Sequence, residues 1–237
     1  MHGLGGSMDS WGPLLDAIGD RDVIMIDTPG MGRSEVPRRP MSIGAIADTF
    51  AAALSELDVD RVDVLGYSHG GTVAQEFAHR HPGRLRRMVL VATVAGVPWL
   101  PPRFTAQRAL LSTRRYHSKA VAARDIPILA GGRTARDAEV LDAILADRQA
   151  HPPSKTGYRY LQIAVMPWSS HPWLHRIQCR TLVLQGDDDP VVRVANGRLL
   201  AARIRNARLE IVGGAGHMML FDEPDRVGPL IAEFLGD

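Results

Sequence analysis

Five residues, Gly66-Tyr67-Ser68-His69-Gly70, constrain the fold of this chain more than any other stretch. An apolar run typical of a buried strand precedes them, and a run typical of a helix follows. G-x-S-x-G at a strand-to-helix junction is the pattern of a nucleophile elbow, in which a tight turn strains the serine backbone to positive φ. A side chain at Gly66 or Gly70 would collide with the crossing strand and helix. The alternative is a glycine-rich turn with an incidental serine.

Apolar runs and amphipathic stretches alternate along the rest of the chain. They predict strands at residues 22–26, 62–65, 88–92, 181–185 and 209–212, and helices at 9–18, 43–57, 71–79, 194–204 and 227–235. The run at 22–26 is apolar throughout, which indicates a strand buried on both faces. The last helix contains Pro229, so we expect it to begin at or after that residue or to be kinked there. The order predicts an α/β fold, a mostly parallel sheet with helices on both faces, and a site at the carboxyl ends of the strands.

The stretch from 97 to 175 differs from the rest, because prolines divide it into short helices and it holds most of the tryptophans and tyrosines. We therefore expect a core in two parts, 1–96 and 176–237, with 97–175 as an inserted helical cap. Its aromatic and apolar side chains either line a substrate pocket or hold the cap together. The pocket candidates are Trp99, Leu100, Phe104, Met166 and Trp168, with Met218 from the core. The same stretch carries a surplus of Lys and Arg, which either attracts a carboxylate or an anionic surface or is a solvated face.

A serine hydroxyl becomes a nucleophile when it has an adjacent base that an acid orients. His217, in a glycine-rich loop after the last predicted strand, is the candidate base. Three consecutive aspartates follow the strand at 181–185, and we choose Asp189 because it is far enough round the turn to face the histidine loop. Asp188 remains the alternative, since aspartates in such a loop also cap the local backbone. The predicted catalytic residues are Ser68, Asp189 and His217.

An acyl-transfer site also needs hydrogen-bond donors for an oxyanion. The expected donors are the backbone N–H groups of His69 and Leu4, the second in a glycine-rich loop near the N-terminus. The alternative for that loop is a frayed terminus. No histidine pair has convincing ligand spacing beside a cysteine or carboxylate, so we expect no metal and no cofactor.

Composition bounds the remaining possibilities. The 237 residues can form one substantial core, and the net charge is +2, without the basic runs and interleaved aromatics of a nucleic-acid-binding surface. One cysteine excludes an intrachain disulfide, and the sequence predicts neither a membrane span nor a signal peptide. We therefore expect a cytoplasmic protein that binds no nucleic acid.

Several separate stretches carry a resemblance to one superfamily. They are His2-Gly3-Leu4-Gly5-Gly6, Asp27-Thr28-Pro29-Gly30-Met31-Gly32-Arg33-Ser34, the G-x-S-x-G segment, residues 186–190 and Gly216-His217. Together they resemble the α/β-hydrolase superfamily, whose chain order of nucleophile, acid and base matches the order Ser68, Asp189, His217. Residues 74–79, 91–96, 173–177, 181–190 and 198–207 look like intracellular medium-chain polyhydroxyalkanoate depolymerases. Those enzymes have a tryptophan where His69 stands and a small apolar residue where Tyr67 stands.

The resemblance implies strands before His2-Gly3, whereas this chain begins with Met1. N-terminal strands are therefore apparently missing, including one between the strand at 22–26 and the elbow strand. Unpaired ladder groups are costly, so a stable monomer would need a substitute partner. A misplaced start codon, another segment of the chain filling the gap, and a homo-oligomer are the alternatives.

The implied activity is that of a serine hydrolase that cleaves carboxylic esters through an acyl-enzyme. The favoured substrate is a polyester or oligomer of medium-chain 3-hydroxy acids, as a small-molecule or polymeric ester. A carbon–carbon bond hydrolase, a lactonase or a thioesterase with the same triad remains open. A non-catalytic ligand-binding protein on a degenerate hydrolase fold is the alternative of another class.

Overall fold

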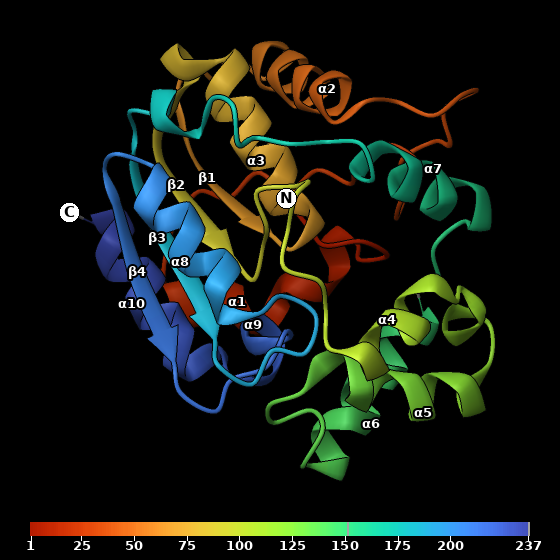
Figure 1. Ribbon diagram of the computed structural model, residues 1–237. Helices are drawn as coiled ribbons and strands as arrows, with labels where there is room; N and C mark the ends of the chain where they lie inside the picture. The colour runs from red at the N-terminus through yellow and green to blue at the C-terminus, as the bar shows by residue number, and fades with distance from the viewer. Residues whose placement is uncertain (151, 237) are drawn as a thin grey trace.

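A four-stranded parallel sheet forms the centre of the computed structural model, which describes residues 1–150 and 152–236 (Figure 1). The strands are β1 (Val62–Tyr67), β2 (Leu85–Val91), β3 (Arg180–Gly186) and β4 (Ala207–Val212), and they lie side by side in chain order. Each strand pairs in parallel with the next. The α/β architecture and four of the five predicted strands are confirmed.

Helices cover both faces of this sheet because its central strands are apolar on both sides. On β2, Met88 and Leu90 pack on one face, while Val89 and Val91 pack on the other. The first face carries α2 (Ile43–Glu56), α3 (His69–Arg80) and α8 (Val194–Arg203). The second carries α1 (Gly12–Ile18), α9 (Met219–Asp222) and α10 (Pro224–Gly236). Two hydrophobic cores thus fix the strands, and with them the loops at their carboxyl ends.

Four helices occupy the stretch between β2 and β3: α4 (Phe104–Leu111), α5 (Lys119–Ala130), α6 (Ala138–Ala150) and α7 (Lys155–Val165). Figure 1 shows α4, α5 and α6 gathered beyond the arrowheads of the strands. The division into a core and a cap at 97 and 175 stays a prediction. Among the described residues, no helix is both long enough and apolar enough to cross a bilayer.

The prediction of a buried strand at 22–26 is wrong. These residues have no regular secondary structure, and Val23, Ile24 and Met25 are 46%, 43% and 39% exposed. The physical reason is the lack of a ladder partner, since no strand of residues 1–150 or 152–236 lies beside this segment. The outer edge of β1 is instead met by Met1, whose amino group donates to Leu65 O (2.8 Å) and whose carbonyl accepts from Tyr67 N (3.1 Å).

The expected start of the last helix at or after Pro229 is also wrong. Helix α10 begins at Pro224 and continues through Pro229. Proline is well tolerated in the first turn, but inside a helix it removes one hydrogen bond. Burial of Val227, Ile231 and Phe234 against the sheet offsets that loss.

Candidate active site

The turn at Ser68 has the strained geometry that its sequence predicts. Ser68 adopts φ 51° and ψ −117° between the end of β1 and the start of α3. Its amide donates to Val91 O (2.8 Å), and its carbonyl accepts from Thr93 Oγ1 (2.7 Å), so two neighbouring segments hold the turn. A Cβ on Gly66 would lie 2.5 Å from Gly70 O, and a Cβ on Gly70 would collide with the Met1 carbonyl. The predicted positive φ is therefore confirmed, as is the predicted collision with the helix at Gly66, whereas the crowding at Gly70 comes from the backbone of Met1 and His2 and not from the strand or the helix.

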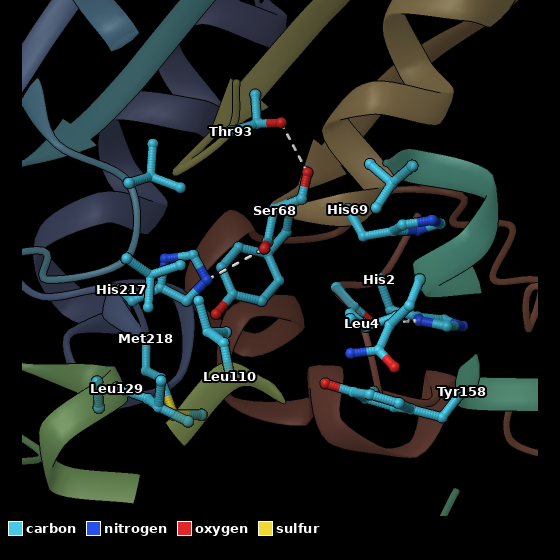
Figure 2. Close-up of a pocket in the computed structure, with 18 of the residues that line it drawn as sticks. His2, Leu4, Ser68, His69, Thr93, Leu110, Leu129, Tyr158, His217 and Met218 are labelled. Carbon is cyan, nitrogen blue, oxygen red and sulfur yellow. Dashed lines mark hydrogen bonds between the residues drawn. The ribbon is translucent and has the colours of Figure 1, made fainter. Parts of the chain in front are cut away.

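A continuous chain of hydrogen bonds runs from Ser68 to a buried carboxylate. His217 Nε2 lies 3.1 Å from Ser68 Oγ (Figure 2), and His217 Nδ1 lies 2.8 Å from Asp189 Oδ2. Asp189 is only 2% exposed, and its Oδ1 accepts the amides of Val191 and Val192, both at 2.8 Å. These bonds satisfy a buried carboxylate and fix its direction.

The two preceding aspartates have other partners. Asp187 Oδ1 accepts from Gly214 N (2.6 Å), an amide of the loop that carries His217 and not one of the local backbone amides that the sequence suggests. Asp188 accepts from Gly132 N (3.1 Å) and forms ion pairs with Arg103 (3.3 Å) and Arg136 (3.2 Å). The structure therefore brings Asp189, and not Asp188, to the imidazole of His217.

Two backbone amides near Ser68 are available as donors. His69 is the first residue of α3, so its N–H has no acceptor within the helix. The N–H of Leu4 donates to no acceptor in the described part of the chain. The loop that carries Leu4 lies against the elbow, since a Cβ on Gly3 would lie 3.3 Å from Ser68 Cβ. Leu4 and His69 both line the cavity described below.

Two buried histidines flank this donor pair on the side of Ser68 away from His217 (Figure 2). His2 is satisfied, because its Nε2 accepts from Thr28 N (3.0 Å) and its Nδ1 lies 2.9 Å from Gly3 O. Neither ring nitrogen of His69 has a hydrogen-bond partner among the described residues. Burial, and secondarily the nearby His2, lowers the pKa of His69 to about 3, so its imidazole is neutral at physiological pH.

A cavity of about 1170 Å³ opens next to Ser68 and His217. Three of the six predicted pocket residues, Trp99, Met166 and Met218, line it. Leu100, Phe104 and Trp168 do not, and for these three the prediction is corrected. Figure 2 shows Met218, Leu110 and Leu129 below Ser68, so most of this wall is apolar.

Each of the three misplaced residues has a physical reason for its position. Phe104 begins α4 and is 77% exposed. Leu100 faces a separate small pocket. The indole of Trp168 donates to Glu76 Oε2 (2.8 Å), which turns it away from the cavity.

Several polar residues of the cavity wall were not predicted from the sequence. They are Tyr67, Arg115, Tyr116, Arg148 and Tyr158. Arg115 donates to Tyr158 Oη (2.6 Å) and more weakly to Tyr116 Oη (3.4 Å). The Tyr67 ring lies 5.3 Å from the His217 ring, centroid to centroid. Arg115 and Tyr116 were detectable only as part of a cluster of aromatic and basic residues, and the cluster did not indicate which of them face inward.

The described residues contain no group of three or more His, Cys, Asp or Glu side chains that could hold a metal ion. The side chains of His217 and Asp189 are hydrogen-bonded to each other, and Asp189 also accepts from the backbone.

Comparison with known proteins gives the family. The pattern that defines the alpha/beta hydrolase fold matches residues 1–224. The chain belongs to the α/β-hydrolase family. It is accordingly a hydrolase, and the superfamily resemblance seen in the sequence is confirmed.

Individual relatives are similar over nearly the whole chain. A poly(3-hydroxyalkanoate) depolymerase of Ectopseudomonas oleovorans is 39% identical over 235 residues, which cover 99% of this chain and 82% of the relative. A 2-hydroxymuconate semialdehyde hydrolase of Pseudomonas sp. strain CF600 is 26% identical, covering 100% and 86%. Among solved structures, a hydrolase from Pseudomonas aeruginosa PA01 superimposes with a TM-score of 0.83 at 27% identity, covering 99% of this chain and 88% of that one.

Proposed function

We propose that this α/β-hydrolase cleaves carboxylic esters through an acyl-enzyme, with Ser68 as nucleophile, His217 as general base and acid, and Asp189 as the orienting acid. The observation that carries the proposal is the unbroken hydrogen-bond chain from Ser68 Oγ through the imidazole to Asp189. A serine hydroxyl is a weak nucleophile, and this arrangement is the one that activates it.

The chemistry proceeds in two halves. Ser68 Oγ attacks the ester carbonyl while His217 Nε2 takes its proton, and the N–H groups of His69 and Leu4 stabilise the oxyanion. The imidazolium then protonates the departing alcohol, which leaves the acyl group on Ser68. Water, deprotonated by the same imidazole, attacks the acyl carbon and releases the carboxylic acid. Asp189 holds His217 in the required tautomer throughout and stabilises its positive charge.

The substrate class follows from the cavity and from one relative. Leu110 and Leu129 offer an apolar surface close to Ser68, which suits an acyl chain of several carbons. The 39% identical relative is named a poly(3-hydroxyalkanoate) depolymerase. We therefore propose polyesters or oligomers of medium-chain 3-hydroxy acids as substrates.

Fluorophosphonate labelling tests whether Ser68 is an activated nucleophile. We expect the folded protein to be labelled on Ser68, and Ser68→Ala and His217→Ala to abolish the label. Ser55→Ala, on α2 and outside the cavity wall, serves as the matched control and is expected to label normally. A folded protein that takes no label would reject the proposal in favour of a binding protein on the same fold.

A panel of p-nitrophenyl acyl esters from short to long chains tests the substrate class. We expect kcat/KM to rise from acetyl to medium-chain esters, since the cavity wall can bury added methylene groups. Labelling of Ser68 without turnover of any ester would instead favour the carbon–carbon bond chemistry for which the 26% identical relative is named.

A further inference from the structure

The cavity wall holds three arginines. Arg159, on α7, is exposed to solvent, whereas the other two are buried or half-buried and have no carboxylate partner among the described residues. Arg115 and Arg148 both line the cavity, and neither forms an ion pair with an aspartate or glutamate in residues 1–150 or 152–236. The two acidic residues of the same wall are engaged elsewhere. Asp9 forms an ion pair at 2.7 Å with an arginine outside the cavity, and Asp147 accepts a serine hydroxyl at 2.8 Å. Burying a positive charge without a counter-ion is energetically costly, which suggests that an anionic ligand group supplies the missing counter-charge.

Arg115 is the buried member of the pair and is held rigidly. It is 5% exposed, and its terminal nitrogens donate to the carbonyls of Ala109 and Ser112 and to the hydroxyls of Tyr116 and Tyr158. All these acceptors are neutral. Arg115 therefore supplies a fixed positive charge behind the wall, with its terminal donors already used.

Arg148, on α6, is the accessible member. It is half-buried, and among the described residues its guanidinium donates to Met218 Sδ (3.8 Å), a weak acceptor, and to the hydroxyl of Tyr116. Its guanidinium carbon lies 5.8 Å from the centroid of the Tyr116 ring, and that of Arg115 lies 4.7 Å from the same ring. Burial alone would raise the pKa of Tyr116, but the two guanidinium charges more than offset it and hold that pKa below its usual value. The field around Tyr116 is therefore positive, and the two acceptors of Arg148 among the described residues leave other N–H groups of its guanidinium available to a ligand.

The position of Arg148 relative to the triad indicates which part of an ester it meets. Arg148 contacts Met218, which directly follows His217 in the chain. Figure 2 shows the side chains of Met218 and His217 on the same side of Ser68. In acyl transfer the imidazole protonates the departing alcohol, so it faces the alcohol part of the ester. A cation beside the residue after that histidine thus lies toward the alcohol part.

We propose that Arg148, backed by Arg115, binds a carboxylate carried by the alcohol part of the ester. This inference rests on the proposed function and deepens it. In an oligomer of 3-hydroxy acids, the alcohol part of the last ester bond is a 3-hydroxy acid, whose carboxylate is separated from the ester oxygen by two carbon atoms. Recognition there makes the enzyme remove single units from the carboxyl end. The rest of the oligomer passes to Ser68, the 3-hydroxy acid leaves with the proton from His217, and water then releases the oligomer as a new carboxylic acid.

The test compares two forms of one substrate, the ester-linked dimer of 3-hydroxyhexanoate with a free carboxylate and the same dimer as its terminal carboxamide. The amide is neutral and keeps the size and the single ester bond. We expect the wild-type protein to cleave the acid with a kcat/KM at least about tenfold above that of the amide, the lower end for a hydrogen bond to a charged group. Arg148→Gln should bring that ratio close to one, and Arg148→Lys should leave it in between, because a point charge keeps attraction but loses the two-pronged geometry.

Arg108→Gln provides the matched control, since this arginine is exposed on α4 and does not line the cavity. It should keep the wild-type ratio, whereas an equal fall in Arg108→Gln would assign the preference to the general charge of the surface and overturn the proposal. A wild-type ratio near one, or a ratio that Arg148→Gln leaves unchanged, would also overturn it. Because the readout is a ratio within one protein, a general loss of rate or folded fraction cancels. Cleavage of p-nitrophenyl esters by the same samples separates failure of this inference from failure of the proposed function.

Discussion

Replacing the buried imidazole of His69 should make the protein less sensitive to acid. Between the folded pKa of about 3 and the unfolded value of about 6.5, the unfolded chain binds a proton on this residue and the folded chain does not. Falling pH therefore shifts the equilibrium toward the unfolded state. The substitutions His69→Phe and His69→Gln remove the titrating group, one with an apolar ring of similar size and the other with a polar amide.

The size of the effect follows from the unfolded state alone, because the folded form binds no proton on His69 in the range considered. With an unfolded pKa of about 6.5, proton binding to His69 favours the unfolded chain by the factor 1 + 10^(pKa − pH). This factor rises about tenfold between pH 7.5 and pH 5.5. Tenfold corresponds to about 1.4 kcal/mol. Burial also lowers the pKa of His2, but that residue is present in all three proteins, so its contribution cancels in the comparison.

Urea denaturation at pH 7.5 and pH 5.5, followed by circular dichroism, measures this loss. We expect the wild-type free energy of unfolding to fall by about 1.4 kcal/mol more than that of either variant. The two variants are expected to agree in this pH-dependent loss even if their absolute stabilities differ, which separates the effect of titration from that of packing. A wild-type loss equal to that of both variants would refute the reasoning.

Three further outcomes are expected. Asp189→Asn should lower kcat for a p-nitrophenyl ester by about 10³–10⁴-fold, as in triads whose acid is neutralised; Asp188→Asn should lower it by less than about tenfold, and the reverse order would identify the wrong acid. Gly70→Ala drives a Cβ into the backbone of the first residue and should lower Tm by several degrees in a thermal melt, so an unchanged Tm would contradict the crowding at this position. Phe77→Ala, which removes a fully buried ring, should cost about 3–5 kcal/mol in urea denaturation, whereas Phe104→Ala should stay within about 0.5 kcal/mol; similar losses would contradict the assigned burial.

Sequence alone predicted the parts of the site that local chemistry dictates. Gly66 and Gly70 indicate a crowded turn, and Asp189 and His217 each follow an apolar run that forms a strand of the sheet. The predicted strands were correct wherever a neighbouring strand exists. The run at 22–26 has the same composition but no partner in the described chain, so its backbone has nothing to pair with. Whether a strand has a neighbour to pair with depends on the whole fold, and the apolar pattern of the segment does not reveal it.

The cavity wall was predicted less well, because side-chain direction in short helices depends on tertiary contacts. Trp99 and Trp168 look equivalent in the sequence, yet one lines the cavity and the other donates to Glu76. Arg115 was part of a basic surplus that equally suited a solvated face, and burial beside Tyr158 became visible only in three dimensions. Composition gives the character of such a region, but not the identity of the residues that face inward.

The loops that carry Asp189 and His217 also bind the helical stretch between β2 and β3. Asp188 accepts a hydrogen bond from Gly132 N and forms ion pairs with Arg103 and Arg136. The amide of His217 donates to Ala130 O (2.6 Å), at the end of α5. A substrate that displaces α5 should therefore also displace His217, because the two are joined by this hydrogen bond. Acyl chains large enough to displace α5 should accordingly alter kcat as well as KM, since α5 is hydrogen-bonded to the backbone of the histidine that carries the proton.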